Sequence, residues 1–354
     1  MKYLHFMRDA NQGGKFLNFI NDNYTEEEHY FIIFAKSLDE FNIKNERNCL
    51  RVFKDNIFKK VRNVLQKMTL SEKIYVHSLR PFDMIFLLIN FKCLKKTNWI
   101  IWGGDLYEHV LRVRTLKNFC YEIMRRVLIK RLGYISTQVK GDYELATQWY
   151  GAKAEYVKLM YPSPLGYEYY DKLKADKGEQ DILNIQIGNS ADSTNNHCEM
   201  IEAMHNFASE NIKVYCPLSY GGDLKYKELV IRCGKEKLGA KFVPLLDFMP
   251  ADEYGKYLNS IDIALFNHDR QQALGNIYAL LYLGKKVYIK SSITSWDHLI
   301  EDVGVKVFDI DNIKNKSFEE FLEYYDAELN EQNVKKIVDR QYAYELWKKE
   351  FEQV

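Results

Sequence analysis

Short runs of β-branched and aromatic residues alternate with amphipathic helical patterns along almost the whole chain. In the first half these runs predict strands at Tyr3–Met7, Tyr30–Ala35, Lys73–His77, Trp99–Trp102, Tyr134–Thr137 and Tyr156–Leu159. In the second half they predict strands at Ile182–Ile187, Lys213–Cys216, Lys241–Val243, Asp262–Phe266, Lys286–Ile289 and Lys306–Phe308. Strands separated by helices are typical of βαβ units and mostly parallel sheets. The pattern therefore predicts an α/β protein with two doubly wound, Rossmann-like domains.

The alternation breaks at residues 162–180, where Pro and Gly residues precede a strongly charged stretch. We interpret this segment as a linker, which gives an N-terminal Rossmann-like domain at 1–165 and a C-terminal one at 166–330. Residues 331–354 are predicted to be helical, and one arrangement open to this segment is packing back on the N-terminal domain. Ligands bind at the carboxyl ends of the strands in such sheets, so we expect the two domains to face a central cleft that holds the site.

The composition is that of a folded globular protein, with 47% apolar and 28% charged residues. The six cysteines include no CxxC pair, which argues against a zinc cage or a disulfide framework and favours a reducing cytoplasm. The sequence has no uninterrupted apolar stretch of the roughly 18 residues that span a bilayer, and its first residues lack the apolar stretch of a signal peptide. We therefore expect any membrane contact to be peripheral.

The net charge of +1 hides an asymmetry between the two halves. Residues 1–165 hold 27 Lys and Arg against 17 Asp and Glu, whereas the rest of the chain holds 23 against 32. A basic first half is suited to an anionic membrane surface or a phosphate-bearing acceptor, although solvated helix faces give the same pattern. The basic residues form no recognisable nucleic-acid module, so nucleic acid is not an expected partner.

Two segments of the first half are candidates for the membrane contact. One is a basic cluster in a predicted helix, formed by Lys117, Arg125, Arg126, Lys130 and Arg131. The other is the apolar segment 81–96, which ends in lysines and is read either as an amphipathic element at the interface or as a buried helix.

Small and polar residues follow the first strand of the second domain, in the segment GNSADSTNNH at 188–197. A strand end, a tight turn and a helix N-terminus together expose backbone N–H groups at a positive dipole end, which suits a diphosphate. The alternative is an ordinary βα loop with a capping or surface histidine. The donor-binding candidates here are Gly188, Asn189, Ser190, Asn195 and His197.

A second polar segment follows the strand that ends at Phe266. An arginine can pair with phosphate oxygens, and glutamine amides can hydrogen-bond sugar hydroxyls, although a polar loop without a ligand is the alternative. The candidates are Arg270, Gln271, Gln272, Gly275 and Asn276. For the nucleobase we single out Tyr220 and Phe242, from the segments 217–220 and 242–246.

The segment WGGDLYE at 102–108 follows a buried-looking strand of the first domain. Gly103 and Gly104 allow close approach of a substrate, and Asp105 or Glu108 could act as a general base for an acceptor hydroxyl. The alternative is that Asp105 caps the next helix. In a direct displacement, one base and a stabilised leaving group suffice, so no covalent nucleophile is needed.

Weaker candidates lie on the acceptor side. They are Asp9, Gln12, Gly13 and Gly14 in the loop after the first strand, Trp102, Gly103 and Gly104 before the predicted base, and Asp142 at the start of a helix. Asp309 and Asp311 have the spacing of a metal-binding Asp-X-Asp motif, but a capping loop is the favoured interpretation. We expect no metal and no cofactor.

Three of these segments resemble motifs of glycosyltransferase family 56, the TDP-N-acetylfucosamine:lipid II N-acetylfucosaminyltransferase family of enterobacterial common antigen and O-antigen synthesis. Residues 101–108 match its IWGADLYE segment, with Gly104 in place of alanine. Residues 188–197 resemble its GNSGDRSNEH segment, and residues 270–275 fit its RQQGIG segment. A further GD of the family matches residues 141–142, and the order and approximate spacing of the motifs agree.

The resemblance implies a GT-B fold and an inverting glycosyltransferase that uses TDP-activated 4-acetamido-4,6-dideoxygalactose (N-acetylfucosamine) as its nucleotide-sugar donor. The implied acceptor is an undecaprenyl-diphosphate-linked glycan, one of the polyprenyl-diphosphate-linked precursors of bacterial surface polysaccharide, such as lipid II. The implied location is the cytoplasmic face of the bacterial inner membrane, as a peripheral protein. With Asp105 as the base and Glu108 in reserve, loops 188–197 and 270–276 would hold the donor diphosphate.

Three alternatives remain open from the sequence. The first is a GT-B transferase with another TDP- or UDP-sugar and an O-antigen or capsule acceptor, because the chain diverges from the family away from the motifs. The second is a nucleotide-sugar epimerase, which would need no acceptor. The third is a sugar-nucleotide sensor without catalytic activity.

Overall fold

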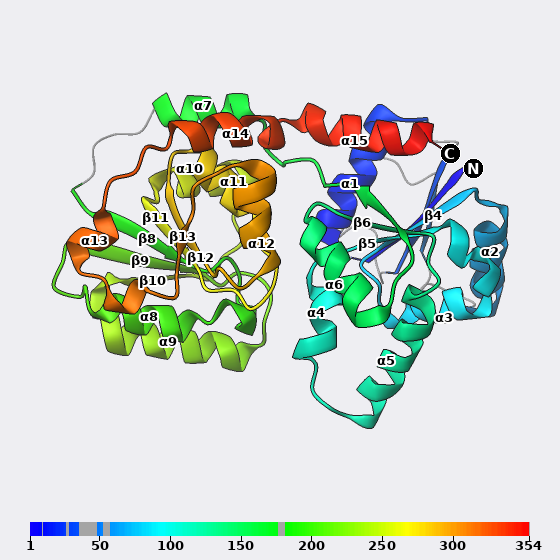
Figure 1. The fold of residues 1–354 in the computed structure, drawn as a ribbon, viewed down its shortest axis with the longest axis horizontal. Helices are drawn as coiled ribbons and strands as arrows, with labels where there is room; N and C mark the ends of the chain where they lie inside the picture. Colours follow the sequence, from blue (N-terminus) through cyan, green and yellow to red (C-terminus); the bar gives the residue numbers. More distant parts are fainter. Residues whose placement is uncertain (9, 26–27, 35–47, 52–56, 176–180, 354) are drawn as a thin grey trace. The chain divides into compact units, whose positions relative to one another are not determined.

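The computed structural model describes residues 1–8, 10–25, 28–34, 48–51, 57–175 and 181–353 (Figure 1). The chain separates into two compact units. Unit 1 contains Met1–Pro162 and Ala343–Val354, and unit 2 contains Ser163–Tyr342. The change of unit lies three residues before the boundary predicted at 165. The predicted C-terminal segment 331–354 is divided, because its first residues belong to helix α14 (Glu328–Val338) of unit 2 and most of helix α15 (Arg340–Glu352) belongs to unit 1.

The described part of unit 1 contains a seven-stranded parallel sheet with the strand order β3-β2-β1-β4-β5-β6-β7. Its strands are β1 (Tyr3–Met7), β2 (His29–Ile33), β3 (Cys49–Arg51), β4 (Lys73–His77), β5 (Thr97–Ile100), β6 (Tyr134–Thr137) and β7 (Glu155–Lys158). Its helices are α1 (Ala10–Asn23), α2 (Ile57–Leu70), α3 (Pro81–Ile89), the 3₁₀ segment η2 (Phe91–Lys96), α4 (Gly104–Leu111), α5 (Leu116–Ile129), α6 (Lys140–Tyr150) and α15.

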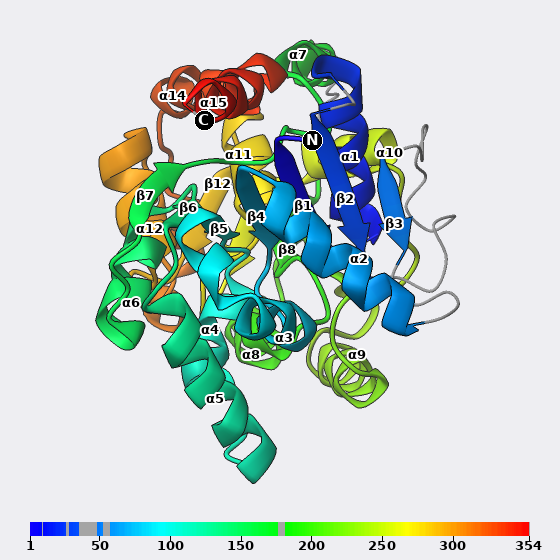
Figure 2. The same cartoon turned by 90° about the vertical axis from the view of Figure 1, so that its right-hand side faces the viewer.

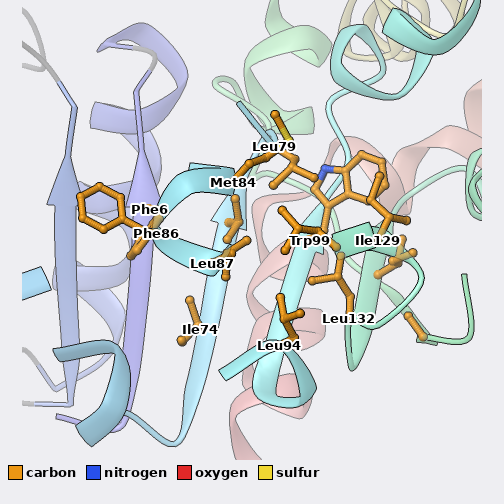
Figure 3. Close-up of a cluster of buried hydrophobic side chains, with 14 of the residues drawn as sticks. Phe6, Ile74, Leu79, Met84, Phe86, Leu87, Leu94, Trp99, Ile129 and Leu132 are labelled. Carbon is orange, nitrogen blue, oxygen red and sulfur yellow. The ribbon is translucent and has the colours of Figure 1, made fainter. Parts of the chain in front are cut away.

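Alternate residues of each central strand of unit 1 enter two different hydrophobic clusters, as expected for a parallel sheet that is covered on both faces. Leu4 and Phe6 of β1 pack with residues of α2, α3 and α5, and Figure 3 shows part of this cluster around Trp99. Tyr3 and Met7 pack on the opposite face with residues of α1 and α15. The two clusters explain why successive residues of a central strand are buried although they point to opposite faces of the sheet.

The described part of unit 2 contains a six-stranded parallel sheet with the order β10-β9-β8-β11-β12-β13. Its strands are β8 (Leu183–Ile187), β9 (Ile212–Pro217), β10 (Phe242–Leu245), β11 (Ile263–Phe266), β12 (Lys286–Ile289) and β13 (Phe308–Asp309). Its longer helices are α7 (Tyr167–Ala175), α8 (His197–His205), α9 (Leu224–Leu238), α10 (Ala251–Ser260), α11 (Leu274–Tyr282) and α14, and its short ones are α12 (Thr294–Asp297), η5 (His298–Val303) and α13 (Phe318–Leu322).

Most predicted strands lie within a few residues of the observed ones, and three features differ. The strand Cys49–Arg51 was not predicted, because three residues at a sheet edge carry too little pattern. The segment interpreted as a linker contains α7, whose Tyr170 and Leu173 are buried one helical turn apart. The single helix predicted after Gln332 is two helices, because Asp339 has an extended backbone between α14 and α15.

Helix α15 is fixed to the sheet of unit 1 by a buried ion pair. The ammonium group of Lys73 lies 2.6 Å from the Glu350 carboxylate, and their side chains are 6% and 1% exposed. The Tyr75 hydroxyl and the Asn98 amide also donate hydrogen bonds to Glu350, at 3.0 and 3.2 Å. One turn earlier, the Trp347 indole donates to the Met160 carbonyl at 2.9 Å. The end of the chain is therefore part of the core of unit 1.

Replacing Glu350 with alanine leaves the Lys73 ammonium group buried without its counter-ion, which costs about 3–5 kcal/mol of unfolding free energy. We expect the urea midpoint of the unit 1 transition to fall accordingly. Glu352→Ala, on the exposed face of the same helix, is the matched control and should stay within about 0.5 kcal/mol of the wild type. Equal losses in the two variants would mean that the buried pair contributes nothing specific.

Candidate functional site

The strand order of unit 2 reverses between β8 and β11, which are neighbours in the sheet although they are far apart in the chain. The connections that follow these two strands leave on opposite sides, so their loops lie together at the carboxyl end of the sheet. This switch point is the usual position for a ligand in an open α/β sheet. The loop after β8 begins at Gly188, and the loop after β11 runs from Asn267 to Ala273.

Gly188 is required by both its backbone and its surroundings. Its φ of +66° is in the left-handed region. A β-carbon at this position would lie 2.6 Å from His197 Nε2 and 2.7 Å from Asn195 Oδ1. The next residue, Asn189, donates its backbone N–H to the same Asn195 oxygen at 3.0 Å. The loop is therefore folded tightly against the 3₁₀ turn Ser193–Asn195 and the start of α8.

The structure brings together the two segments that the sequence predicted for donor binding. His268 Nε2 lies 3.1 Å from Asn195 Oδ1, and the Thr194 hydroxyl lies 3.3 Å from Gln272 Oε1. Arg270 pairs with Asp192 at 3.2 Å. These contacts join residues more than 70 positions apart in the sequence, so the two motifs form one polar cluster. We call it the donor loops (188–197 and 267–276), after the role that the sequence predicts for it.

The charges of the donor loops are arranged around Arg270 and Asp192. Although burial raises the pKa of the Asp192 carboxyl, hydrogen bonds from Thr194 and the charge of Arg270 outweigh it and hold the pKa below its ordinary value. Arg270 is largely buried, with a side chain 14% exposed. A largely buried guanidinium at the carboxyl end of a sheet can exchange its carboxylate partner for phosphate oxygens.

Two histidines of the donor loops are neutral at pH 7. Burial lowers the pKa of His197 to about 4, with a small opposing effect of Asp192. Burial also lowers the pKa of His268 well below its ordinary value, and the charge of Arg270 acts in the same direction. Each ring therefore presents one N–H donor and one acceptor nitrogen.

Four buried side-chain atoms of the donor loops have no hydrogen-bond partner among the described residues. They are Asn189 Oδ1, His197 Nε2, His268 Nδ1 and Gln272 Nε2. Buried polar atoms in folded proteins nearly always have a partner, so four such atoms at one switch point favour a polar ligand there.

Backbone strain also gathers at the carboxyl ends of the strands. The non-glycine residues with positive φ in the described part of the chain are Ser78, Asn196 and Ala273, which follow β4, β8 and β11. Ala273 precedes α11, which lacks a side-chain cap at its N-terminus, and a β-carbon on Gly275 would meet nothing within 4 Å. Strain of this kind is concentrated at ligand sites, and the open first turn of α11 suits an anion.

Of the other predicted donor residues, some lie at the donor loops and one does not. Tyr220 lies at the donor loops, since its hydroxyl accepts a hydrogen bond from the Asn189 amide at 2.9 Å. Ser190 and Gln271 lie within the same loops, and Asn276 contacts the Tyr254 hydroxyl. Phe242 does not lie at the donor loops. It is the first residue of β10, at the amino end of the strand, and its ring packs on Gly234 of α9.

His268 is a residue of the site that the sequence interpretation missed. It stands two positions after the end of β11 and two before Arg270. That position at a strand end, beside a predicted phosphate ligand, was the available signal. A single histidine in a polar loop is so common that the signal was not used.

In unit 1, Asp105 is a fully buried residue of the first turn of α4. Its carboxylate accepts hydrogen bonds from the Leu79 backbone N–H at 2.9 Å, the Trp99 indole at 2.6 Å and the Trp102 backbone N–H at 3.0 Å. These bonds tie the loop after β4 to the loop after β5. A carboxylate held in this way orients the segment, and this geometry does not present it to a substrate hydroxyl.

Glu108 lies one turn further along α4 and is 39% exposed. Its carboxylate pairs with Arg80 at 3.0 Å and lies 3.8 Å from Arg125. Arg125 was assigned to a basic cluster on the surface, and the structure corrects this, because its side chain is 1% exposed. Its guanidinium donates to the Asp105 carbonyl at 2.6 Å and to the Tyr150 hydroxyl at 3.1 Å.

The predicted acceptor-side residues are only partly brought together. Asp9 lies outside the described residues. Gln12, Gly13 and Gly14 were predicted in a loop, but helix α1 begins at Ala10 and includes all three. Asp142 is buried in the first turn of α6 and accepts a hydrogen bond from the Tyr107 hydroxyl at 3.3 Å.

The WGG segment lies before the first turn of α4. Gly103 has a φ of +81° and forms the N-cap, and Gly104 is the first helical residue. The Trp102 indole donates to the Tyr161 hydroxyl at 2.8 Å. This glycine turn lets the chain pass from β5 into α4 and fixes Asp105 beneath it.

A chain of buried histidines crosses the sheet of unit 1 and was not predicted. His5 lies 3.1 Å from His29 and 3.2 Å from His77, nitrogen to nitrogen. His77 is hydrogen-bonded in turn to the Tyr161 hydroxyl, which leads to Trp102. Burial lowers the pKa of His29 and of His77 to about 3, so the chain is neutral at pH 7.

Asp309 ends β13, and Asp311 lies in the turn after it; neither side chain caps the next 3₁₀ segment, Ile313–Asn315. Asp309 Oδ1 accepts a hydrogen bond from the Asp311 backbone N–H at 3.1 Å, and its Oδ2 accepts one from the Ser291 hydroxyl at 2.9 Å. These bonds account for both oxygens of Asp309.

Several solved structures are similar to this chain over its whole length. HepE from Anabaena in complex with UDP is 13% identical with a TM-score of 0.70, and the match covers all of both chains. A sucrose-phosphate synthase from Thermosynechococcus elongatus is 8% identical with a TM-score of 0.68, also over both full chains. A glycosyltransferase from Rickettsia africae is 12% identical with a TM-score of 0.66, covering 99% of this chain and 97% of the other.

The likeness extends over both Rossmann-like units of this chain, and the class of fold is GT-B, as predicted. The chain belongs to the family described as 4-alpha-L-fucosyltransferase glycosyl transferase group 56, whose model matches residues 15–344. The resemblance found in the sequence motifs is confirmed, and the protein is a glycosyltransferase. Within the described ranges no helix has the length and apolar character needed to cross a membrane.

The buried histidine chain makes the stability of unit 1 depend on pH. The folded-state pKa values of about 3 lie below the unfolded value of about 6.5, so the unfolded state binds more protons between these limits. Stability is therefore fully present above pH 6.5 and is lost as the pH falls toward 3, by about 1.4 kcal/mol per pH unit for each histidine. Urea unfolding at pH 7.0 and 5.5, where few carboxylates titrate, measures this loss.

The variant His29→Phe assigns the effect, because its ring can occupy the aromatic surroundings of Tyr3 and Phe351. It should remove one histidine's share of the pH dependence. The same dependence in the wild type and in His29→Phe would show that this ring is not held neutral in the folded state.

Proposed function

We propose that the protein is an inverting transferase that moves 4-acetamido-4,6-dideoxygalactose from a TDP-sugar to an undecaprenyl-diphosphate-linked glycan in bacterial surface polysaccharide synthesis. On this proposal it works at the cytoplasmic face of the inner membrane and needs no metal. The observation that carries the proposal is the joining of the two family motifs at the β8/β11 switch point, with Arg270 and four unpartnered polar atoms. HepE, which shares the fold, was solved with UDP, which is consistent with a nucleotide-sugar donor.

We assign the donor diphosphate to the donor loops because of the groups that these loops offer to phosphate oxygens. Arg270 and the open first turn of α11 would bind its oxygens, which carry the negative charge that develops when the sugar leaves. Neutral His197 and His268 can donate hydrogen bonds without adding charge. Tyr220, which is 49% exposed and bonded to Asn189, is the remaining candidate for the nucleoside.

For the base we favour Glu108 over Asp105. A base must reach the hydroxyl proton that it removes, and the Glu108 carboxylate is partly exposed, whereas Asp105 is buried with both oxygens occupied. Asp105 is then a positioning residue that holds the loops after β4 and β5. Arg80 is paired with Glu108. In the proposed reaction, the acceptor hydroxyl would take the place of Arg80 beside the Glu108 carboxylate.

The donor is tested by calorimetric titration of the purified protein with TDP, UDP, GDP and NAD, without acceptor. We expect TDP to bind most tightly, and Arg270→Ala to weaken its binding roughly ten- to a hundredfold, because a charged hydrogen bond to phosphate is lost. Arg232→Ala on the exposed face of α9 is the matched control and should bind normally. Preference for UDP would mean that the donor is a UDP-sugar and not a TDP-sugar. If none of the four nucleotides bound, the proposed donor site would be wrong.

The base is tested by turnover with saturating donor and acceptor. Glu108→Gln should lower kcat by at least about a hundredfold and leave TDP binding unchanged, because a general base contributes about 10²–10⁴ to the rate. Asp105→Asn should instead lower the melting temperature, since its amide group would oppose the N–H donors around it, at about 1–3 kcal/mol. Full turnover by Glu108→Gln, together with a stable but inactive Asp105→Asn, would return the role of base to Asp105.

A further inference from the structure

Exposed apolar side chains of unit 1 are concentrated in one region. Among the described residues of this unit, ten of the twelve large apolar side chains that are exposed lie within residues 82–91 and 110–123. Six of them form the end of α4, the loop after it and the first two turns of α5: Val110, Leu111, Val113, Leu116, Phe119 and Ile123. We call this group the α4–α5 tip.

The α4–α5 tip is exposed in a way that a soluble helix rarely is. Leu116 is 81% exposed, Val113 74% and Phe119 62%. Leu116, Phe119 and Ile123 are spaced i, i+3 and i+7, so they form one stripe along α5. A stripe with this period normally faces a core, and here no described residue covers it.

Helix α3 repeats the pattern beside α5, against which it packs. Phe82, Ile85 and Ile89 have the same i, i+3, i+7 spacing and are 48%, 43% and 60% exposed. Figures 1 and 2 show α3, α4 and α5 on the same side of the sheet of unit 1, with the loop before α5 extending furthest from it. Contiguous apolar exposure of this kind marks an interaction site.

The charges around the tip identify the kind of partner. Residues 80–131 contain eleven Lys and Arg but four Asp and Glu. Of the basic residues, Arg125 is buried, and Arg80, Arg112 and Arg126 pair with Glu108 or Glu122, so the other seven carry the excess charge. All four acidic groups are engaged inside the unit: Asp83 with Arg8, Glu108 with Arg80, Glu122 with Arg112, and Asp105 with backbone and indole N–H groups. Arg114 and Lys117 are exposed within the tip itself.

We propose that the α4–α5 tip inserts its apolar side chains into the interface of an anionic lipid bilayer, while the surrounding Lys and Arg bind the lipid headgroups. Apolar residues beside exposed basic ones, without free acidic groups, are the composition of interfacial elements. A second copy of the chain is the less suitable partner, because a two-fold contact would place the same strongly basic surface against itself. The inference rests on the proposed function solely for its link to a lipid-anchored acceptor.

The test is flotation of the purified full-length protein with phosphatidylcholine vesicles, with and without phosphatidylglycerol, in the absence of donor and acceptor. We expect binding to the anionic vesicles, weaker at high salt. Leu116→Ser/Phe119→Ser and Arg114→Glu/Lys117→Glu should each weaken it by at least about tenfold. The matched controls are Leu224→Ser/Phe248→Ser, which are similarly exposed in unit 2, and Lys153→Glu/Lys172→Glu, which reverse two exposed charges elsewhere. Both should bind as the wild type does.

Three outcomes would overturn the inference: no binding to anionic vesicles, equal losses in the control variants, or a dimer in sedimentation equilibrium that Leu116→Ser/Phe119→Ser dissociates. Melting temperatures of all variants show whether each is folded. Because the vesicles contain no glycan and the assay contains no nucleotide, failure of the transferase proposal leaves this result intact. Conversely, TDP binding by the tip variants should equal that of the wild type, whatever the vesicles show.

Discussion

The constraint on which the rest of this structure depends is that all the described strand pairs in each sheet are parallel. Parallel strands deliver their functional loops to one edge, and the strand order reverses at one place in each unit, between β1 and β4 and between β8 and β11. Residues distant in sequence meet there for topological reasons before any side chain is considered. The pairing of Asn195 with His268 and of Asp192 with Arg270 follows from it.

The donor loops are held in place by the protein's own contacts. Gly188 allows the loop after β8 to fold onto Asn195, and the positive φ of Asn196 and Ala273 turns the chain into α8 and α11. The strained backbone persists because the packed sheet next to it fixes both strand ends. A site that is ordered in advance loses less conformational entropy on binding and can direct its dipoles at a developing charge.

The sequence predicted the features that depend on local patterns of residues, and it missed those that depend on contacts between distant segments. Alternation of strands and helices was sufficient for two doubly wound units. The motifs singled out two segments, 188–197 and 270–276, that the structure brings into contact. The role of Asp105 could not be predicted from the sequence, because its hydrogen-bond donors lie on β5 (Trp99), in the loop after β5 (Trp102) and in the distant loop after β4 (Leu79). Phe242 and Arg125 were misplaced for the same reason, since burial by a distant helix leaves no local signal. The histidine chain needs the register of β2, β1 and β4, which no local pattern encodes.

Helix α4 connects the proposed chemistry of unit 1 with its proposed membrane contact. It has eight residues, and at a rise of about 1.5 Å each it is about 12 Å long. Asp105 anchors its first turn, Glu108 lies at its middle, and Val110 and Leu111 at its end belong to the α4–α5 tip. A lipid-linked acceptor carries its reacting hydroxyl a short distance above the headgroups, so a base must be held at a fixed height over the bilayer. On these two proposals, a short rigid helix that is buried at one end and inserted at the other would set that height, and the buried Asp105 carboxylate would contribute to the reaction without touching the substrate.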